Sequence, residues 1–122
     1  MDLAAFFQAH DGVGVLSTAD GAGVVNSALF ARPHIEADRA LFISVDRQNL
    51  ANLRENPSAS YLFQAHGEGY EGVRLSLKLA EISEDEARIQ PLLRTHARED
   101  VKRYLLIFDI ISVRPLVGSG ED

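Results

Sequence analysis

The chain has 122 residues and a formal net charge of -6, and 46% of its residues are hydrophobic. These values predict one globular domain spanning residues 1–122 and exclude a disordered chain. The acidic balance argues against nucleic acid or an anionic membrane as a partner, because an acidic protein repels polyanions. The sequence contains no cysteine, which excludes disulfide bonds, thiolate nucleophiles and cysteine-ligated metal clusters.

The N-terminal residues 1–6 lack the basic start of a signal peptide, and no apolar run reaches membrane-spanning length. We therefore expect a cytoplasmic protein. The histidines at positions 10, 34, 66 and 96 do not have the spacing of metal ligands, so no metal site is expected. His34 is the histidine with the strongest case for a function, because it follows Arg32 at the end of the second strand, but a solvated loop residue is the favoured interpretation.

Apolar patterning and turn residues divide the chain into short elements. The glycine-rich turn at residues 20–23 predicts a hairpin, and Ser83 with Glu86 has the spacing of a capping box that opens a helix. Pro33 ends the second strand, and a polar turn follows it. In chain order the predicted elements are a helix before Gly12, strands over 13–18, 24–32 and 40–45, a helix over 47–56, strands over 58–65 and 73–82, a helix reaching Leu93, and a strand over 104–113.

These elements predict a mainly β fold with few helices. Six short strands joined largely by hairpins favour an antiparallel barrel over a doubly wound parallel sheet, because parallel pairing needs long crossover connections. The final strand is apolar on both faces over most of its length, which predicts that it lies in the centre of the molecule.

The segment over residues 40–57 indicates an anion site, because a strand runs into a helix without a linker. Asp46 is predicted to cap the helix and Pro57 to end it. The free N–H groups at the helix start, together with Arg47, Gln48 and Asn49, would then surround one point. A phosphate group is the predicted ligand.

The order of elements resembles the FMN-binding split β-barrel of the pyridoxamine 5'-phosphate oxidase-like family, and the likeness covers most of the chain from residue 13 onward. A six-stranded antiparallel split barrel is therefore the predicted fold. The segments that carry the resemblance are 31–34, 41–44, 47–49 with 52–57, 69–75 and 107–110.

The resemblance implies that FMN is the cofactor and that two FMN molecules lie at the interface of a homodimer. It places the second strand along the flavin ring, the third strand and following helix at the phosphate, and residues 72 and 74 where a second subunit reaches the flavin. The implied cofactor contacts are Ser27, Ala28, Leu29, Arg32, Ile43, Ser44, Arg47, Gln48, Asn49, Asn52, Gly72 and Arg74.

The predicted function is that of an FMN-dependent oxidoreductase acting on a small molecule. A non-catalytic electron-transfer or cofactor-binding module is an alternative. Gln48 and Asn49 replace the cations that many family members carry at these positions. A second alternative is therefore a split barrel that has lost FMN and binds haem, a deazaflavin or only a protein partner. For the residues themselves, ion pairs are the alternative for Arg32, Arg47 and Arg74, and capping or solvation for Asn49 and Asn52.

Overall fold

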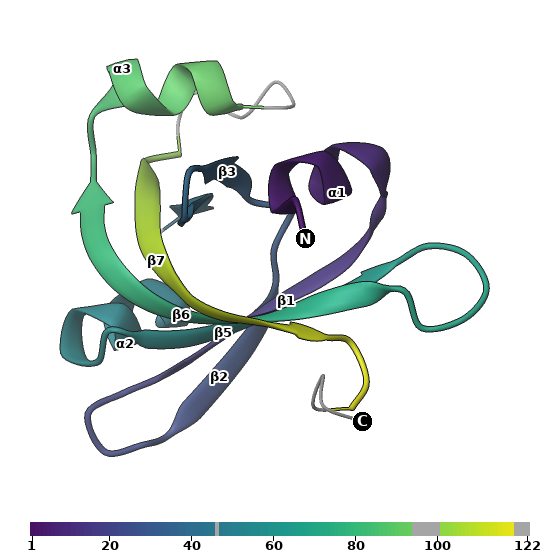
Figure 1. The fold of residues 1–122 in the computed structure, drawn as a ribbon. Helices are drawn as coiled ribbons and strands as arrows, with labels where there is room; N and C mark the ends of the chain where they lie inside the picture. Colours follow the sequence, from purple (N-terminus) through teal and green to yellow (C-terminus); the bar gives the residue numbers. More distant parts are fainter. Residues whose placement is uncertain (46, 94–100, 119–122) are drawn as a thin grey trace.

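A computed structural model describes residues 1–45, 47–93 and 101–118. Within these residues, seven strands form one antiparallel sheet, accompanied by short helices (Figure 1). The elements are α1 (Leu3–Ala9), β1 (Gly12–Ala19), β2 (Val25–Leu29), β3 (His34–Glu36), β4 (Arg39–Val45), α2 (Gln48–Glu55), β5 (Ser58–Ala65), β6 (Gly72–Ser83), α3 (Glu86–Ile89), the 3-10 turn η1 (Gln90–Leu92) and β7 (Arg103–Pro115).

The sheet coils into a barrel with an open seam. Its strand order is β2-β1-β5-β6-β7-β4-β3, so β2 and β3 form its two edges. Every strand pair is antiparallel, as the sequence predicted. The long strands β6 and β7 curve upward beneath α3 in Figure 1, and two register shifts in their pairing accompany this curvature.

The strand β7 divides the hydrophobic core into two clusters, because its side chains alternate between the two faces of the sheet. Tyr104, Leu106 and Phe108 pack inside the barrel with the inner faces of the other strands. Leu105 and Ile107 pack on the opposite face against α3 and β4. All residues from 103 to 108 are buried, which confirms the predicted central strand.

The predicted elements are confirmed with small shifts of their ends, but the predicted strand count is too low. Residues 34–36 form β3, which pairs with β4, directly after the proline that was expected to end the ladder. His34 is therefore a half-buried strand residue, and its interpretation as a solvated loop residue is wrong.

Two caps also differ from the predictions. Asp85 caps α3 by accepting from the Ala87 N–H, while Ser83 accepts from the Asp85 N–H, so the N-cap is Asp85 instead of Ser83. Arg47 is the N-cap residue of α2, without a side-chain cap hydrogen bond. The predicted cap Asp46 lies outside the described residues. Among the helices in the described residues, none combines the length and apolar character needed to cross a membrane.

Candidate functional site

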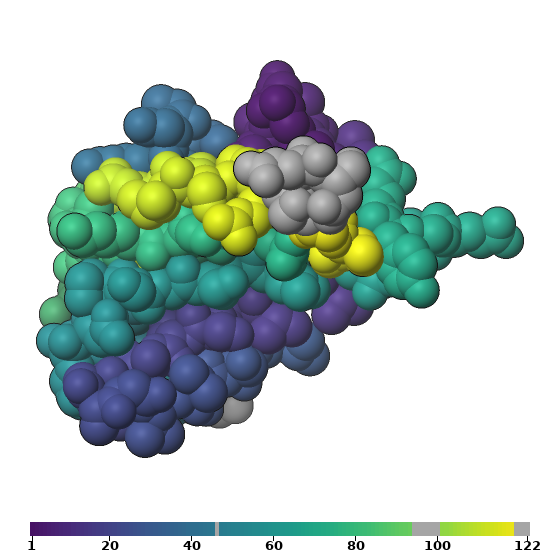
Figure 2. All heavy atoms as spheres, turned by 60° about the horizontal axis from the view of Figure 1, so that its bottom comes forward, coloured from purple at the N-terminus to yellow at the C-terminus, as the bar shows by residue number. Residues whose placement is uncertain are grey.

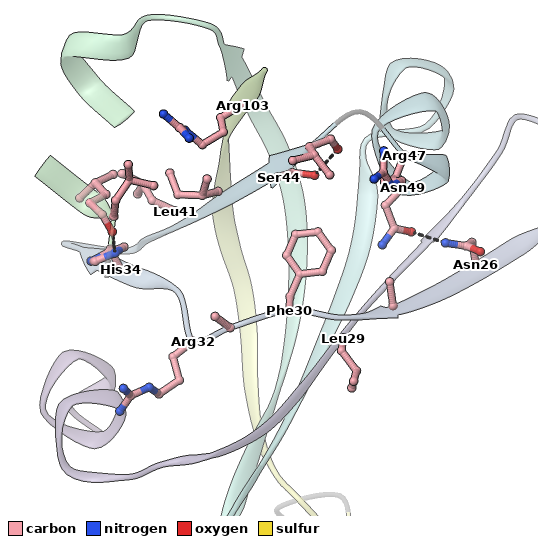
Figure 3. Close-up of a pocket in the computed structure, with 16 residues that line it drawn as sticks. Asn26, Leu29, Phe30, Arg32, His34, Leu41, Ser44, Arg47, Asn49 and Arg103 are labelled. Atoms are coloured by element: carbon pink, nitrogen blue, oxygen red, sulfur yellow. Dashed lines mark hydrogen bonds between the residues drawn. The ribbon is translucent and has the colours of Figure 1, made fainter. Parts of the chain in front are cut away.

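A cavity of about 500 Å³ lies at the barrel seam, where β2 faces β4 (Figure 3). The two strands come close at this point but do not pair, since β2 is an edge strand. The α2 N-terminus and η1 contribute to different parts of the cavity wall, and the start of β7 pairs with the end of β4. The residues that line the cavity are Asn26, Ala28, Leu29, Phe30, Ala31, Arg32, His34, Leu41, Ile43, Ser44, Val45, Arg47, Asn49, Leu92, Leu93 and Arg103.

The open edge of β2 offers backbone hydrogen-bonding groups to the seam. The Phe30 N–H donates to the Gly14 carbonyl on β1 over 2.9 Å. Backbone groups alternate between the two sides of an antiparallel strand, so Leu29 and Ser27 direct theirs away from β1. The Tyr61 hydroxyl holds the end of this wall by donating to the Phe30 carbonyl over 3.1 Å.

This contact between Tyr61 and the end of β2 depends on Gly14. A Cβ at residue 14 would lie 1.9 Å from the Tyr61 hydroxyl oxygen and 2.7 Å from the Phe30 carbonyl oxygen. Only a residue without a side chain leaves room for the tyrosine at this crossing point. The glycine in β1 therefore permits the hydrogen bond that supports the cavity wall.

Arg47 and the start of α2 form a positively charged end of the cavity. Helix geometry leaves the N–H groups of residues 48–50 without an acceptor inside the helix, and the helix dipole adds positive potential there. Arg47 precedes these groups as an exposed side chain that lines the cavity. Placing a cation at this helix end costs free energy, which a bound anion offsets. The arrangement therefore suits an oxyanion such as phosphate.

Asn49 and Asn52 hold α2 onto β1 through a buried polar network. They are 2% and 1% exposed. Asn49 Oδ1 accepts from Thr18 Oγ1 (2.5 Å) and from Asn26 Nδ2 (3.0 Å), and Asn52 Nδ2 donates to Thr18 Oγ1 (3.0 Å). Gln48 joins through a 2.8 Å bond to Asn52 Oδ1. Asn49 and Asn52 therefore fix the helix rather than cap it or face solvent, whereas the Gln48 side chain is exposed.

The predicted ligand Arg32 is directed away from the centre of the cavity. Its Nη1 donates to the carbonyls of Phe7 and His10 over 2.7 Å each, and it lies 3.5 Å from Asp11 Oδ1. In Figure 3 the side chain extends toward α1. Carbonyls at a helix C-terminus attract cations, so Arg32 stabilises the end of α1. The ion-pair alternative raised for this residue fits these contacts.

Arg103, at the start of β7, and His34, on β3, also line the cavity. Arg103 is 8% exposed, and its Nη2 lies 3.6 Å from Glu86 Oε1 on α3. His34 Nε2 lies 2.7 Å from the Leu92 carbonyl oxygen. A carbonyl only accepts, so Nε2 must carry the proton. Both residues hold the segment after β6 against the barrel.

A second ion pair ties the start of β7 to the loop before α3. Lys102 forms a hydrogen bond and an ion pair with Glu84, and both lower the pKa of the Glu84 carboxyl group from its ordinary value. The same contacts raise the pKa of Lys102. The pair is solvent-exposed, so it orients the segment more than it stabilises the fold.

Seven predicted site residues line this cavity, and five do not. Ala28, Leu29, Arg32, Ile43, Ser44, Arg47 and Asn49 line it. Ser27, Gln48, Asn52, Gly72 and Arg74 do not. Ser27 hydrogen-bonds Ser17 on the outer face of the sheet (2.7 Å), and Arg74 Nε donates to the Pro115 carbonyl (2.8 Å).

Sequence reasoning did not include three lining residues that come from distant segments. Arg103 and Leu92 come from the last third of the chain, and His34 from the strand that was not predicted. A charged residue beginning an otherwise apolar strand was the available signal for Arg103. In the described residues, no group of three or more His, Cys, Asp or Glu side chains is placed to hold a metal.

Searches with the sequence found no matching protein-family model and no matching curated protein. Solved structures do match. An FMN-binding protein from Syntrophomonas wolfei subsp. wolfei has a TM-score of 0.80 and 19% identity over 95% of this chain and 84% of its own. An F420 reductase has a TM-score of 0.71 and 15% identity, covering 85% and 90%. A protein provisionally described as a pyridoxamine 5'-phosphate oxidase, from Lactobacillus delbrueckii, has a TM-score of 0.70 and 14% identity, covering 93% and 91%.

The chain has the split β-barrel fold of these proteins. This confirms the fold that the sequence resemblance implied. Identities this low establish the architecture of the split barrel, while its function must be argued from the site itself.

Proposed function

We propose that this split barrel binds FMN in the seam cavity and acts as a flavin-dependent oxidoreductase on a small molecule. The observation that carries the proposal is the cavity itself. It places a cationic helix N-terminus beside an open strand edge and an apolar wall. A phosphorylated, flat and mostly apolar ligand needs these three features together. The likeness to an FMN-binding protein supports the same ligand.

Each part of the cavity fits one part of FMN. Arg47 and the N–H groups at the start of α2 would hold the phosphate through charge-assisted hydrogen bonds. The backbone of Ser27 and Leu29 would bind the polar edge of the ring. Ala28 and Ile43 would form the apolar wall, which is flat because their side chains are small or extended along the strands.

Bound flavin supplies the hydride or electron transfer of such an enzyme. The contribution of the chain is to bind, orient and shield. Asn49 and Asn52 hold the phosphate-binding end in place through their bonds to β1. The apolar side chains of η1 and β4 that line the cavity would shield a bound flavin from water. The alternative function, a non-catalytic electron-transfer module, would use the same contacts to the flavin but would bind no substrate.

Titration of the purified protein with FMN tests this proposal. We expect saturable quenching of flavin fluorescence, and weaker binding of riboflavin, which lacks the phosphate. Steady oxidation of a reduced nicotinamide by the loaded protein with an added acceptor would favour the enzyme over the carrier. A protein that takes up neither flavin contradicts the proposal.

A deazaflavin is the second candidate ligand, because one structure of similar fold is an F420 reductase. Another similar structure, with a TM-score of 0.64 and 14% identity, is an FAD-binding protein from Mesorhizobium loti. A competition binding assay with FMN, FAD and F420 would rank the affinities of the protein for the three cofactors. A cytoplasmic location completes the proposal, and fluorescence microscopy of a tagged chain tests it.

We further propose that two copies of the chain pair through the outer face of β2, β1 and β5. Figure 2 shows the bands of β2 (blue), β1 (purple), β5 and β6 (teal) and β7 (yellow) following one another across this face. Leu29, Val15 and Leu62 form an apolar row across three strands. Leu29 is 76% exposed and also lines the cavity, so the apolar face continues into the flavin site. A second copy would bury both the apolar face and the mouth of the flavin site.

Small residues beside the apolar row would permit two sheets to approach closely. A continuous row of serines crosses five strands next to it and consists of Ser27, Ser17, Ser60, Ser76 and Ser112. Short side chains leave the surface level, and hydroxyls satisfy one another, as Ser17 and Ser27 do. Gly72 and Arg74 lie on β6, which is next to β5 in the sheet, so a second copy could bring them toward the flavin of the first.

Changing Leu62 to glutamate should convert the dimer to a monomer, because the substitution places a carboxylate at the β5 end of the apolar row, on the proposed interface. Light scattering at micromolar concentration measures the change. Glu36→Lys is the control: residue 36 is exposed on β3 at the other edge of the sheet and should leave the dimer intact. A wild-type monomer of 13.4 kDa under these conditions contradicts the dimer.

A further inference from the structure

We propose that the groove between α1 and β3 is a second binding site, which holds the ammonium group of a primary amine with an apolar body. The body of this ligand extends toward the seam cavity, so the amine is part of the substrate. This role as the substrate rests on the proposed flavin site, whereas binding of the amine itself can be tested without flavin.

The groove is a cavity of about 420 Å³ beside the N-terminal helix. In Figure 1, α1 lies next to β3, and the two elements are in contact. Ala4, Phe7 and Gln8 line the groove from the helix, because residues three and four apart share one helix face. Ile35 and Glu36 line it from β3. The site therefore has a helix as one wall and a strand as the other.

The groove adjoins the seam cavity. Arg32, His34 and Leu92 line both of them, and Figure 3 shows Arg32 and His34 at the seam. Two peptide units separate Arg32 from His34, and they span at most about 7 Å. A ligand of the size of an arylalkylamine is long enough to reach from the groove into the seam cavity.

A carboxylate without a partner is the feature that indicates the ligand. Glu36 is exposed on β3, and its carboxylate has no hydrogen bond or ion pair within the residues that the structure describes. Its cross-strand neighbour Arg39 directs Nε to Asp109 instead, over 3.0 Å. The Gln8 amide on the helix wall also has no partner among these residues. Carboxylate and amide oxygens both accept hydrogen bonds, which an ammonium group donates.

The other ionisable side chains of the groove are already engaged. Arg32 Nη1 donates to two carbonyls at the end of α1 and lies 3.5 Å from Asp11 Oδ1. His34 Nε2 donates to the Leu92 carbonyl. Glu36 therefore contributes the charge that the groove leaves without a counterion. The chain as a whole has a net charge of -6, which adds a long-range attraction for cations.

Apolar residues of the groove account for the body of the ligand. Phe7, Pro33 and Ile35 give the groove an apolar surface, and Leu92 continues this surface into the seam cavity. Burying a hydrocarbon chain or ring against them is favourable, since apolar surface is removed from water. A primary amine with an apolar body uses both the acceptors and this surface.

Two probes that differ in one group test the site: 3-phenylpropylamine, a cation at neutral pH, and 3-phenylpropanol, which is neutral. In the flavin-free protein, binding is measured as a nuclear magnetic resonance shift of the Gln8 side-chain amide, assigned through Gln8→Ala. In the flavin-loaded protein, it is measured as a perturbation of flavin absorbance. The variant is Glu36→Gln, which removes the charge and keeps the shape. The control is Asp38→Asn, because Asp38 is an exposed carboxylate nearby that does not line the groove.

We expect the wild type to bind the amine about tenfold more tightly than the alcohol, which is the effect of one charge-assisted hydrogen bond near the surface. Glu36→Gln should remove this preference, while Asp38→Asn should retain it. FMN affinity should be unchanged in both variants. Equal binding of the amine and the alcohol by the wild type overturns the proposal, whether or not the variants fold. An equal loss in Asp38→Asn also overturns it, because the preference would then come from the acidic surface in general.

Three further outcomes separate this site from the flavin site. If the wild type binds no flavin, but the amine still shifts the Gln8 signal in a Glu36-dependent way, the flavin proposal fails and the amine site stands. If the loaded protein binds the amine without a change in flavin absorbance, the ligand does not reach the seam cavity, and its role as the substrate is overturned. Absence of a Gln8 shift with the amine overturns the amine site itself.

Discussion

Arg47→Ala is expected to weaken FMN binding by about 2 kcal/mol, or roughly 30-fold, because it removes a charge-assisted hydrogen-bond donor from the phosphate. The remaining N–H groups at the start of α2 would retain part of the affinity. Fluorescence titration with FMN and riboflavin measures the effect. The loss should be confined to FMN, since riboflavin has no phosphate for Arg47 to bind.

A matched control for this variant is available on the same helix. Arg54 is an exposed arginine in the last turn of α2, where its guanidinium lies 5.8 Å from the centre of the Tyr104 ring. Arg54→Ala removes the same charge from the protein but lies away from the cavity lining. It should change FMN affinity less than twofold. Equal losses in the two variants would indicate a general charge effect and remove Arg47 from the phosphate site.

Asn49→Ala is expected to lower the free energy of unfolding by about 3 kcal/mol, because several buried polar groups lose their partner at once. Asn49 contacts Thr18, Asn26 and the Leu16 carbonyl from a position that is 2% exposed. For a chain of this length, the loss corresponds to a fall in Tm of about 10 °C. Urea and thermal unfolding followed by circular dichroism measure both quantities.

Gln48→Ala is the control for the network, because its exposed side chain makes one hydrogen bond to Asn52. This substitution should lower the free energy of unfolding by only about 0.5 kcal/mol. A double-mutant cycle of Asn49→Ala with Thr18→Val should show coupling of about 1 kcal/mol, since the two side chains are in direct contact. Similar costs for the Asn49 and Gln48 variants would mean that the network does not hold α2.

The buried network gives Asn49, at the start of α2, a different role from the one that the family resemblance implied. The resemblance placed Asn49 among the phosphate ligands, at a position where many members carry a lysine. In this chain the amide oxygen points into the network with Thr18 and Asn26 instead. The corner therefore relies on Arg47 and the helix N-terminus for its positive potential.

Short-range patterns determined the secondary structure of this protein. Alternating apolar residues predicted β6, whose side chains at 73, 75 and 77 are buried while those at 76 and 78 are exposed. Strand, helix and proline signals over 40–57 predicted β4, α2 and the end of that helix within one or two residues. These signals are local: they depend on side-chain period, capping and backbone restriction.

Only the tertiary structure decided which polar residues face the site. Arg32 lies in the sequence next to the predicted flavin strand, yet the carbonyls of α1, more than 20 residues away, orient its guanidinium. For Asn49 and Asn52 the sequence left capping or solvation as the alternative to ligand binding, whereas in the structure both contact Thr18, over 30 residues away, in the core. A side chain follows its best available hydrogen bonds, and their partners are set by the packing of distant segments.

The sequence by itself determined a mainly antiparallel β fold, its approximate elements and the strand-to-helix corner with Arg47, since these follow from local preferences. It did not determine the short strand β3, which depends on pairing with β4, or the position of Arg103 in the cavity wall. Val45 and Arg103 are 58 positions apart and become neighbours only through the β4–β7 register. Long-range strand pairing therefore decided the shape and charge of the cavity, because it brings together residues that no local pattern connects.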